Sequence, residues 1–417
     1  MTRRLLLPWV GAALLLLVLP FVFSSGASLT MMSLMGFAII FALSFNMLLG
    51  QTGMLSFGHA VYYGMGGFMT AHALNVIAAG KWPIPLPLLP LVGGLAGLFF
   101  AIVFGWVSTK RAGTAFSMIS LGVGELVAAC SLILRGFFGG EGGVSTSRTA
   151  TLRLFDISFG PQIQVYYLIA AWCLLCMAAM YAFTRTPLGR MCNAVRDNPE
   201  RAEFVGYSTQ MVRFIAFCAA GMFAGIAGGL AAIHYEIVTS SVVGAGPSGY
   251  VLLMAYIGGV AVFIGPIIGA VLMTALQISL SDYTGAWLLY VGLMFVLMVM
   301  FAPWGLGGLI LMHQPLIARG TWRSVVPAYA QVSVPILMLA VGGILLIETC
   351  HHLLVHAANG TAMRVLWMNY DARSPLVWLA CAALLLAGGW LLKRMSPKVS
   401  AAFHTARAKA MTIGQES

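Results

Sequence analysis

Apolar runs of roughly 20 residues recur along the whole chain, which is the length that a helix needs to cross a bilayer. The alternating segments of about ten residues that build a transmembrane β-barrel are absent from the sequence. The pattern therefore predicts an all-α, polytopic helical membrane protein. The expected spans are Leu5–Phe23, Ser28–Leu49, Phe57–Ala79, Leu88–Val107, Ala115–Leu134, Val165–Phe183, Phe214–His234, Tyr250–Leu280, Trp287–Phe301, Val334–Leu354 and Leu376–Leu392.

The apolar stretch Tyr250–Leu280 is interrupted by glycine and proline. It contains Gly258-Gly259 and Gly265-Pro266, residues that break or kink helices. Irregular backbone at membrane depth is tolerated only inside protein or beside a water-filled cavity. We expect two crossings or a re-entrant pair here, which gives about 10 core transmembrane helices, followed by two C-terminal ones.

Composition and charge support a membrane protein and set its orientation. Of the 417 residues, 60% are hydrophobic and 8% are charged, against about a quarter charged in soluble domains. The net charge of +11 lies in short connections between spans, so it predicts orientation and not nucleic-acid binding. With the N-terminus inside, 16 of the 22 basic residues fall on the inner side, and both termini are cytoplasmic.

The N-terminal segment has features of a secretory signal. Arg3 and Arg4 precede a leucine-rich run that ends at Phe23. The run is longer than a usual signal core and another span follows at once. We therefore expect an uncleaved first helix.

The inward connection 186–209 carries its own helix signals. Asn198 is a favourable N-cap, Pro199 suits the first helical position and Glu200 suits the helix dipole. Gly206 suits a left-handed C-terminal cap. These residues predict a short helix, Pro199 to Val205, with Ala202 and Phe204 or Val205 as contacts for a partner. The alternative is an ordinary solvated loop whose arginines only set orientation.

Several motifs together resemble one family. The loop 186–209 is similar to the cytoplasmic motif of importer permeases of the ATP-binding-cassette (ABC) superfamily. The stretch Gly50–Ala60 (GQTGMLSFGHA) resembles the signature of branched-chain amino-acid permeases. Matches continue in family order over Ser120–Glu125, Gly258–Ala270 and Pro303–Gly308.

The resemblance implies a permease core at 1–310, with 186–209 as its cytoplasmic coupling loop. It implies two cytosolic ATP-binding subunits, a second related permease subunit and a periplasmic substrate-binding protein as partners, in the lipid of the cell inner membrane. The coupling residues are then Pro199, Glu200, Ala202, Glu203 and Gly206. The sequence has no Walker-type phosphate loop, so ATP and its hydrolysis belong to the partners, and the chain needs no cofactor of its own.

Four polar residues are candidates for the translocation pathway. Gln51, Ser56 and His59 lie in the glycine-rich stretch at a helix boundary, where they either line a gate or serve packing, with His59 as a hydrogen-bonded structural histidine. Glu125 is the acid within a core span, and membrane-embedded acids are often functional. It either contacts a polar solute or pairs across a subunit interface.

Three further groups of residues have simpler interpretations. His352 and His356 have i,i+4 spacing, but interfacial anchoring is the better interpretation, and we expect no metal site. Cys173 and Cys176 lie mid-span and are expected to pack as small apolar residues. The loop Gly139–Thr146, with His234 and Glu236, either touches a docking partner or is a wetted end.

The last segment, 311–417, departs from the family pattern, with two added spans and a basic tail. The favoured function is import of branched-chain amino acids or similar small polar solutes. The alternatives are urea or short amides as the solute, or a secondary transporter without ATPases. A secondary transporter often has several embedded ionisable groups, which the core lacks apart from Glu125.

Overall fold

A computed structural model describes residues 2–150, 158–355, 362–365 and 368–413. Helices dominate the described residues, and the strands there form two short two-stranded ladders, which confirms the all-α polytopic fold class. The elements are α1 (Thr2–Val22), α2 (Gly26–Thr52), α3 (Ala60–Ala78), α4 (Leu89–Ser108), α5 (Thr114–Ile133), α6 (Arg135–Phe138), β1 (Val144–Ser145), α7 (Gln162–Arg185), α8 (Pro187–Asp197), α9 (Pro199–Phe204), α10 (Thr209–Tyr235), β2 (Ile237–Val238), α11 (Ala245–Gly258), α12 (Gly265–Tyr283), α13 (Trp287–Phe301), α14 (Gly305–Ala318), α15 (Val326–Val355), β3 (Ala362–Val365), β4 (Met368–Asp371) and α16 (Pro375–Ile413), with short 3-10 turns between them.

Eight helices in the described part of the chain are long and apolar enough to cross a membrane, and the bent pair α13–α14 makes a ninth. Among the described residues, Leu7–Val22 of α1 is apolar but shorter than these spans, and α3 and α11 do not meet the criteria. The predicted total of ten core spans and two C-terminal ones is reached when these three also cross.

The chain divides into two compact units. The first consists of Met1–Ile278 and Phe295–Gly307, and the second of Ser279–Met294 and Gly308–Ser417. The predicted boundary at residue 310 differs from this division, because Ser279–Met294 groups with the C-terminal residues.

Glycine-rich faces build the centre of the first unit. Helix α10 packs against α2, α3 and α4. A Cβ atom added at Gly225 of α10 would lie 2.9 Å from the Cα atom of Gly97 in α4, and one added at Gly93 would lie 2.6 Å from the carbonyl oxygen of Gly225. Only glycine permits so close an approach of two helix backbones.

The interrupted stretch forms two helices, as the sequence predicts. Helix α11 ends at Gly258, and Gly259 follows with φ +106°, a conformation that favours glycine. The 14 residues of α11 rise about 21 Å, less than the bilayer core of about 30 Å. Helix α11 is therefore a partial span that ends in an irregular segment before α12.

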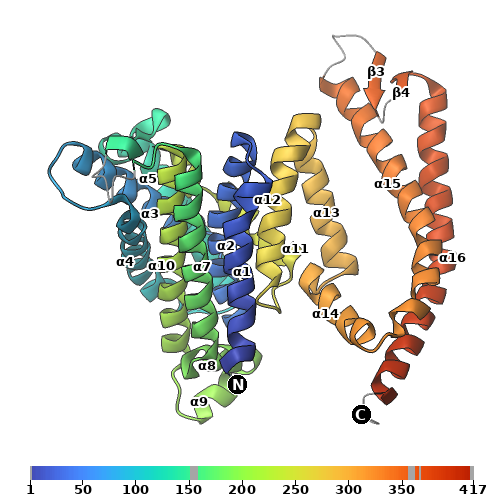
Figure 1. Cartoon of the computed structure of the whole chain (residues 1–417), viewed down its shortest axis with the longest axis horizontal. Coiled ribbons are helices and arrows are strands. Elements are labelled where there is room, and N and C mark those ends of the chain that lie inside the picture. The colour runs from blue at the N-terminus through green and yellow to red at the C-terminus, as the bar shows by residue number, and fades with distance from the viewer. Residues whose placement is uncertain (1, 151–157, 356–361, 366–367, 414–417) are drawn as a thin grey trace. The chain divides into compact units, whose positions relative to one another are not determined.

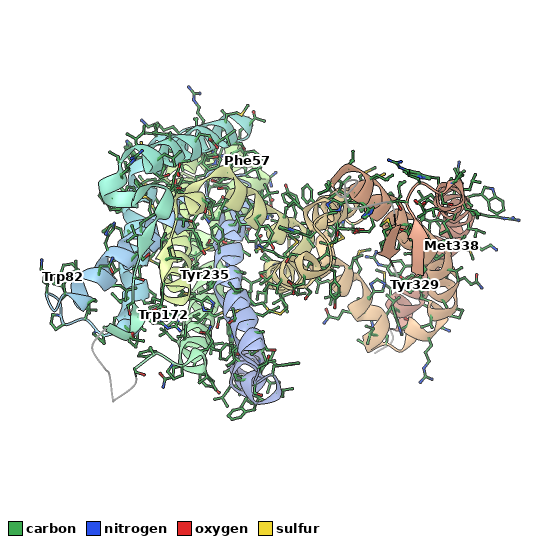
Figure 2. All side chains as sticks on the ribbon, turned by 90° about the horizontal axis from the view of Figure 1, so that it is seen from above. Phe57, Trp82, Trp172, Tyr235, Tyr329 and Met338 are labelled. Carbon is green, nitrogen blue, oxygen red and sulfur yellow. The ribbon has the colours of Figure 1, made fainter. Side chains whose placement is uncertain are left out.

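The two ends of the first unit differ. The start of α1 lies at the same end as α8 and α9, which we call the loop end (Figure 1). Trp82, 50% exposed, projects from the rim of this unit, whereas Trp172 is turned inward and donates to the Pro87 carbonyl over 2.9 Å (Figure 2). Exposed tryptophan at a span end is typical of a membrane interface.

The second unit is built on the pair α15 and α16. Leu384 and Leu385 of α16 pack where Gly342 of α15 leaves room. Both helices exceed their predicted spans, and α16 continues as helix through the basic tail to Ile413. Glu348 of α15 accepts hydrogen bonds from Tyr290 (2.8 Å) and Thr284 (3.1 Å), which ties Ser279–Met294 into this unit.

Candidate functional site

The connection 186–209 folds as two short helices, α8 and α9. The Thr186 hydroxyl accepts the amide hydrogen of Gly189 (3.1 Å) at the start of α8. The Asn198 side chain accepts the amide hydrogen of Arg201 (2.9 Å) at the start of α9, which confirms the predicted cap. Helix α9 ends at Phe204, one residue earlier than predicted.

The end of α9 is closed by Gly206, as predicted. Its φ is +90°, and its amide donates to the Glu203 carbonyl over 2.8 Å. The amide of Tyr207 donates to the Ala202 carbonyl over 3.1 Å. This pair of bonds is the Schellman motif, so both ends of α9 are fixed by local hydrogen bonds.

Helix α9 has one buried face and one exposed face. Ala202 is 4% exposed and packs in an apolar cluster with Val195 and Val212, so its side chain faces the bundle, and its role in coupling stays a prediction. Phe204 is 91% exposed and Val205 is 70% exposed. Phe204 and Val205, which the sequence offers as contacts for a partner, therefore form an exposed apolar pair at the C-terminal end of α9.

Acidic residues of α9 have different roles. Glu203 accepts a hydrogen bond from the Thr209 hydroxyl over 2.8 Å and so joins α9 to the start of α10. Glu200 and Pro199 are exposed in the first turn. A carboxylate there interacts favourably with the helix dipole.

Helix α8 connects this segment to the bundle. Cys192 lies on the buried face of α8, and burial raises the pKa of its thiol to about 12. The Arg196 guanidinium donates to the Gly50 carbonyl at the end of α2 and to the Asp197 carboxylate. We did not predict the Arg196 contact, because 146 residues separate it from Gly50.

The glycine-rich stretch 50–60 is buried. Gln51, Ser56 and His59 are 8%, 0% and 0% exposed. The Nε2 atom of His59 lies 2.9 Å from the Ser44 hydroxyl, and its ring stacks on Phe41, with centroids 5.6 Å apart. His59 is therefore hydrogen-bonded and packed, as the structural interpretation predicts.

The two glycine-rich motifs of the sequence meet in space. The amide of Phe57 donates to the Ser120 hydroxyl (3.0 Å), and the Ser117 hydroxyl donates to the Leu55 carbonyl (2.8 Å). A Cβ atom at Gly58 would lie 3.3 Å from the Gly124 amide nitrogen. The stretch 50–60 is therefore fixed against α5.

Several buried polar atoms in this region have no hydrogen-bond partner among the described residues. They are Asn46 Oδ1, Gln51 Oε1, Ser56 Oγ and His59 Nδ1. Unpaired buried polar atoms are rare, and each one needs an explanation such as a ligand or water. Asn46 was missed by the sequence analysis, although an amide within an apolar span is a recognisable signal.

Glu125 lies apart from this polar region. It is on an exposed face of α5, a helix whose span is 33% buried, and makes no hydrogen bond or ion pair with any residue that the structure describes. A carboxylate in the middle of a span is costly against lipid. This face of α5 therefore needs a polar or protein neighbour.

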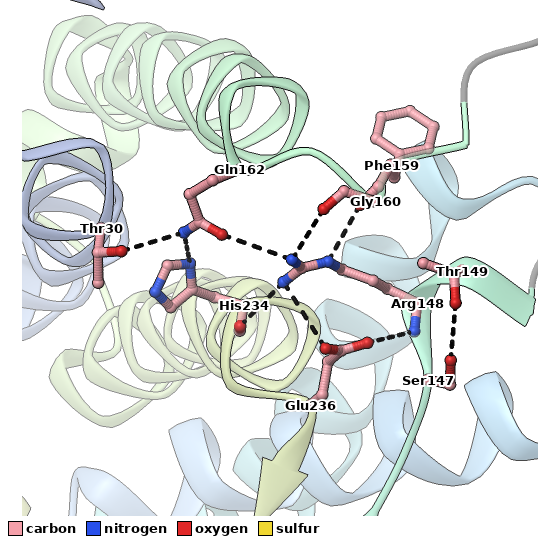
Figure 3. Close-up of polar contacts among 9 residues, drawn as sticks. All are labelled: Thr30, Ser147, Arg148, Thr149, Phe159, Gly160, Gln162, His234 and Glu236. Carbon is pink, nitrogen blue, oxygen red and sulfur yellow. Dashed lines mark hydrogen bonds and ion pairs between the residues drawn. The ribbon is translucent and has the colours of Figure 1, made fainter. Parts of the chain in front are cut away.

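The end opposite the loop end carries an ion-paired cluster (Figure 3). Arg148 lies 4.0 Å from Glu236 and also donates to the carbonyls of Phe159 (3.0 Å) and His234 (3.2 Å). Gln162 links this cluster to His234 Nδ1 over 3.4 Å. His234 and Glu236 thus hold the connection after β1 against the bundle.

No group of three or more metal-binding side chains occurs among the described residues. His352 lies on α15, and His356 is outside the described residues. Cys173 and Cys176 are buried, as expected for packing. The described side chains thus offer helix packing and docking, and no cluster suited to metal chemistry.

The permease component of the branched-chain amino acid transport system is the family whose model matches residues 28–302. This match covers most of the chain. The chain belongs to this family. It is therefore a multi-pass membrane protein and the non-catalytic permease subunit of an ABC importer.

Two curated relatives are similar over most of their length. The high-affinity branched-chain amino acid transport system permease protein LivM of Salmonella typhimurium is 27% identical over 308 residues, 69% of this chain and 71% of the relative. LivM of Escherichia coli K12 is 27% identical over 322 residues, 71% of this chain and 73% of the relative. No solved structure matches. The family match ends at residue 302, before α14, α15 and α16.

Proposed function

We propose that this permease moves branched-chain amino acids, or similar small polar solutes, into the cytoplasm across the cell inner membrane. Two cytosolic ATPases supply the energy, a second related permease completes the pathway and a periplasmic binding protein delivers the solute. Both termini and the loop end face the cytoplasm. The names of the two LivM relatives support the choice of solute.

The observation that carries the proposal is the exposed end of α9. Phe204 and Val205 are large apolar side chains that are 91% and 70% exposed, on a helix whose two ends are fixed by caps. An exposed apolar pair on a rigid support is a typical docking feature. We assign it to the ATPase.

The packing of α8 and α9 explains how docking would move the bundle. Ala202 lies in one apolar cluster with Val212 of α10, and Arg196 bonds the end of α2. A push on α9 therefore reaches two of the most buried spans through direct contacts. Rigid-body motion of this kind is the usual basis of alternating access.

The exposed face of α5 supports a second permease. Glu125 needs a polar neighbour, and a pathway between two permeases supplies one. Ser56 and His59 are buried in the stretch that is fixed against this helix, so we assign them to positioning the pathway helices and not to solute contact.

The test is uptake by proteoliposomes that contain this chain, candidate ATPases, a second permease and a binding protein. Leucine uptake should require internal ATP and be lost in Gly206→Asp, which strains the α9 cap. Gly80→Asp is the matched control, because Gly80 also has positive φ (+72°) and open space, but lies at the end of α3. It should transport normally.

The outcomes separate mechanism from solute. ATP-driven uptake of urea or a short amide in place of leucine would retain the mechanism and change the solute class. Uptake that needs neither ATP nor partners, and whose rate is unchanged in Gly206→Asp, would contradict the proposal.

A further inference from the structure

A polar cavity of about 340 Å³ opens at the loop end of the first unit, between α2, α7, α8 and the irregular segment after α11. This volume is at the lower end of the range of about 300–1,000 Å³ that is typical of small-molecule sites. Its lining includes Asn46, Gln51, Asn193, Arg196 and Phe263. The assignments above use Arg196 only as a link between α8 and α2 and give this cavity no ligand.

Two side chains of the lining are buried and lack partners. Asn46 is 5% exposed and Gln51 is 8% exposed, and their oxygens Oδ1 and Oε1 accept no hydrogen bond from any described residue. Buried amide oxygens are normally paired. They therefore call for a ligand with N–H groups, and an ammonium group supplies three.

A guanidinium group lies at the same cavity. Arg196 bonds the Gly50 carbonyl and Asp197, and a guanidinium has five N–H donors. Its planar fork is well suited to a carboxylate. The cavity thus combines acceptors for an ammonium with donors for a carboxylate.

The remaining wall is apolar. Val260, Ala261 and Phe263 come from the irregular segment between α11 and α12 and complete the lining. Phe263 is half-buried, and its ring packs edge-on against Tyr181 with centroids 5.3 Å apart. This wall suits a small aliphatic side chain.

We propose that the cavity is a binding site for a free α-amino acid with an aliphatic side chain, entered from the loop end. Arg196 takes the carboxylate, Asn46 and Gln51 take the ammonium group, and Phe263 contacts the side chain. The inference rests on the proposed function, because the ligand is the imported solute after its release into the cytoplasm.

Occupancy has a consequence for transport. Arg196 links α8 to α2 through the Gly50 carbonyl, and the carboxylate of the ligand competes for the same guanidinium. A bound amino acid therefore weakens the link between the coupling segment and a central span. Imported solute should slow further import from the inside.

The first test is binding to the full chain in lipid nanodiscs, without other subunits. Radiolabelled leucine should bind, whereas 4-methylpentanoate, which lacks the ammonium, and isoamylamine, which lacks the carboxylate, should each compete at least about tenfold more weakly. Inorganic phosphate and urea each match one half of the site and should also compete poorly. Equal competition by phosphate or urea would overturn the assignment to an amino acid.

The variants separate binding from folding. Arg196→Gln should weaken leucine binding about tenfold or more, and Arg190→Gln, an exposed arginine on the same helix, should leave it unchanged. Asn46→Leu should abolish binding while the protein keeps its melting temperature, because the replaced amide oxygen has no partner to lose among the described residues. Binding that survives both Arg196→Gln and Asn46→Leu would overturn the site.

The second test is transport against preloaded solute. Leucine inside proteoliposomes should lower the initial rate of ATP-driven uptake for wild type and Arg190→Gln, and much less for Arg196→Gln. ATP-driven uptake that is insensitive to internal leucine would overturn the regulatory inference and leave the proposed function intact. If the wild type shows no ATP-driven uptake but still binds leucine in nanodiscs, the proposed function is contradicted and the binding site stands.

Discussion

Helices α10 and α15 are both long and apolar enough to span a membrane, yet they are packed very differently. In the most apolar part of each helix, 78% of the residues of α10 are buried, against 17% for α15. The difference lies in small residues. Gly221 and Gly225 of α10 meet Gly93 and Gly97 of α4 at backbone distance, whereas a Cβ atom added at Gly343 of α15 would have no described neighbour within 4 Å.

The comparison separates two kinds of information in an apolar run. Its length and hydrophobicity say that a helix enters the membrane, and the spacing of its small residues says where another helix packs. Exposed side chains such as Val334 and Leu337 on α15 are compatible with lipid, which is as apolar as they are. Evenly hydrophobic spans therefore need not belong to one packed core.

The largest expected effect comes from disrupting the close contact between α10 and α4. In Gly225→Leu, the Cβ atom of the new side chain would lie only 2.9 Å from the Cα atom of Gly97. We expect a loss of about 3 kcal/mol or more in folding free energy. Gly343→Leu is the control and should leave stability unchanged. Thermal unfolding of the two purified variants, followed by size-exclusion chromatography, checks the prediction, and equal stability would contradict it.

A smaller loss is expected at the Arg148 cluster. Arg148→Ala removes the ion pair with Glu236 and leaves the carbonyls of Phe159 and His234 without the guanidinium donor. We expect a cost of about 2 kcal/mol and faster proteolysis of the connection after β1. Arg135→Ala removes an exposed arginine from the same end and should have little effect. Equal proteolysis of both variants would show that the cluster does not hold this connection.

The α9 cap gives an effect of about 1 kcal/mol. Gly206→Ala forces a Cβ into a backbone with φ +90°, whereas Gly206→Asn should lose less, because asparagine adopts this conformation more readily. Hydrogen exchange of the amides of Gly206 and Tyr207 measures the difference. Faster exchange in the asparagine variant than in the alanine variant would contradict the cap.

The smallest effect concerns the thiol under α8. Burial raises the pKa of Cys192 to about 12 from the ordinary value of 9.0. The thiol therefore stays protonated in the folded protein, and this contribution to stability is present below about pH 9 and lost as the pH rises toward 12. Maleimide labelling of Cys192 in a variant without the other cysteines should be negligible at about pH 8. Rapid labelling of the folded protein would contradict its burial.

Local signals in the sequence predicted the fold class and the capped helix. Asn198 and Gly206 act on residues three or four positions away, so their roles follow from sequence order. The contacts of Arg196 with Gly50, and of Arg148 with Glu236, span 146 and 88 residues and depend on the packed bundle. No short-range rule reaches them.

Some signals were present in the sequence and were not used. The spacing Gly93-x-x-x-Gly97 and Gly221-x-x-x-Gly225 marks close helix contacts and predicts which spans are central. Ala202 lies opposite Phe204 on α9, but its inward position becomes clear only with Val195 and Val212 beside it. Whether the coupling and pathway residues act as assigned stays a prediction.

The most direct test of the account is whether the exposed end of α9 holds the ATPase. We would purify the reconstituted complex with Phe204→Ser/Val205→Ser and, as a control, with Leu354→Ser, an 85% exposed leucine on α15. We expect the double variant to fold normally but to lose the ATPase and ATP-driven uptake together, while the control keeps both. Retention of the ATPase by the folded double variant would contradict the claim that energy enters through α9.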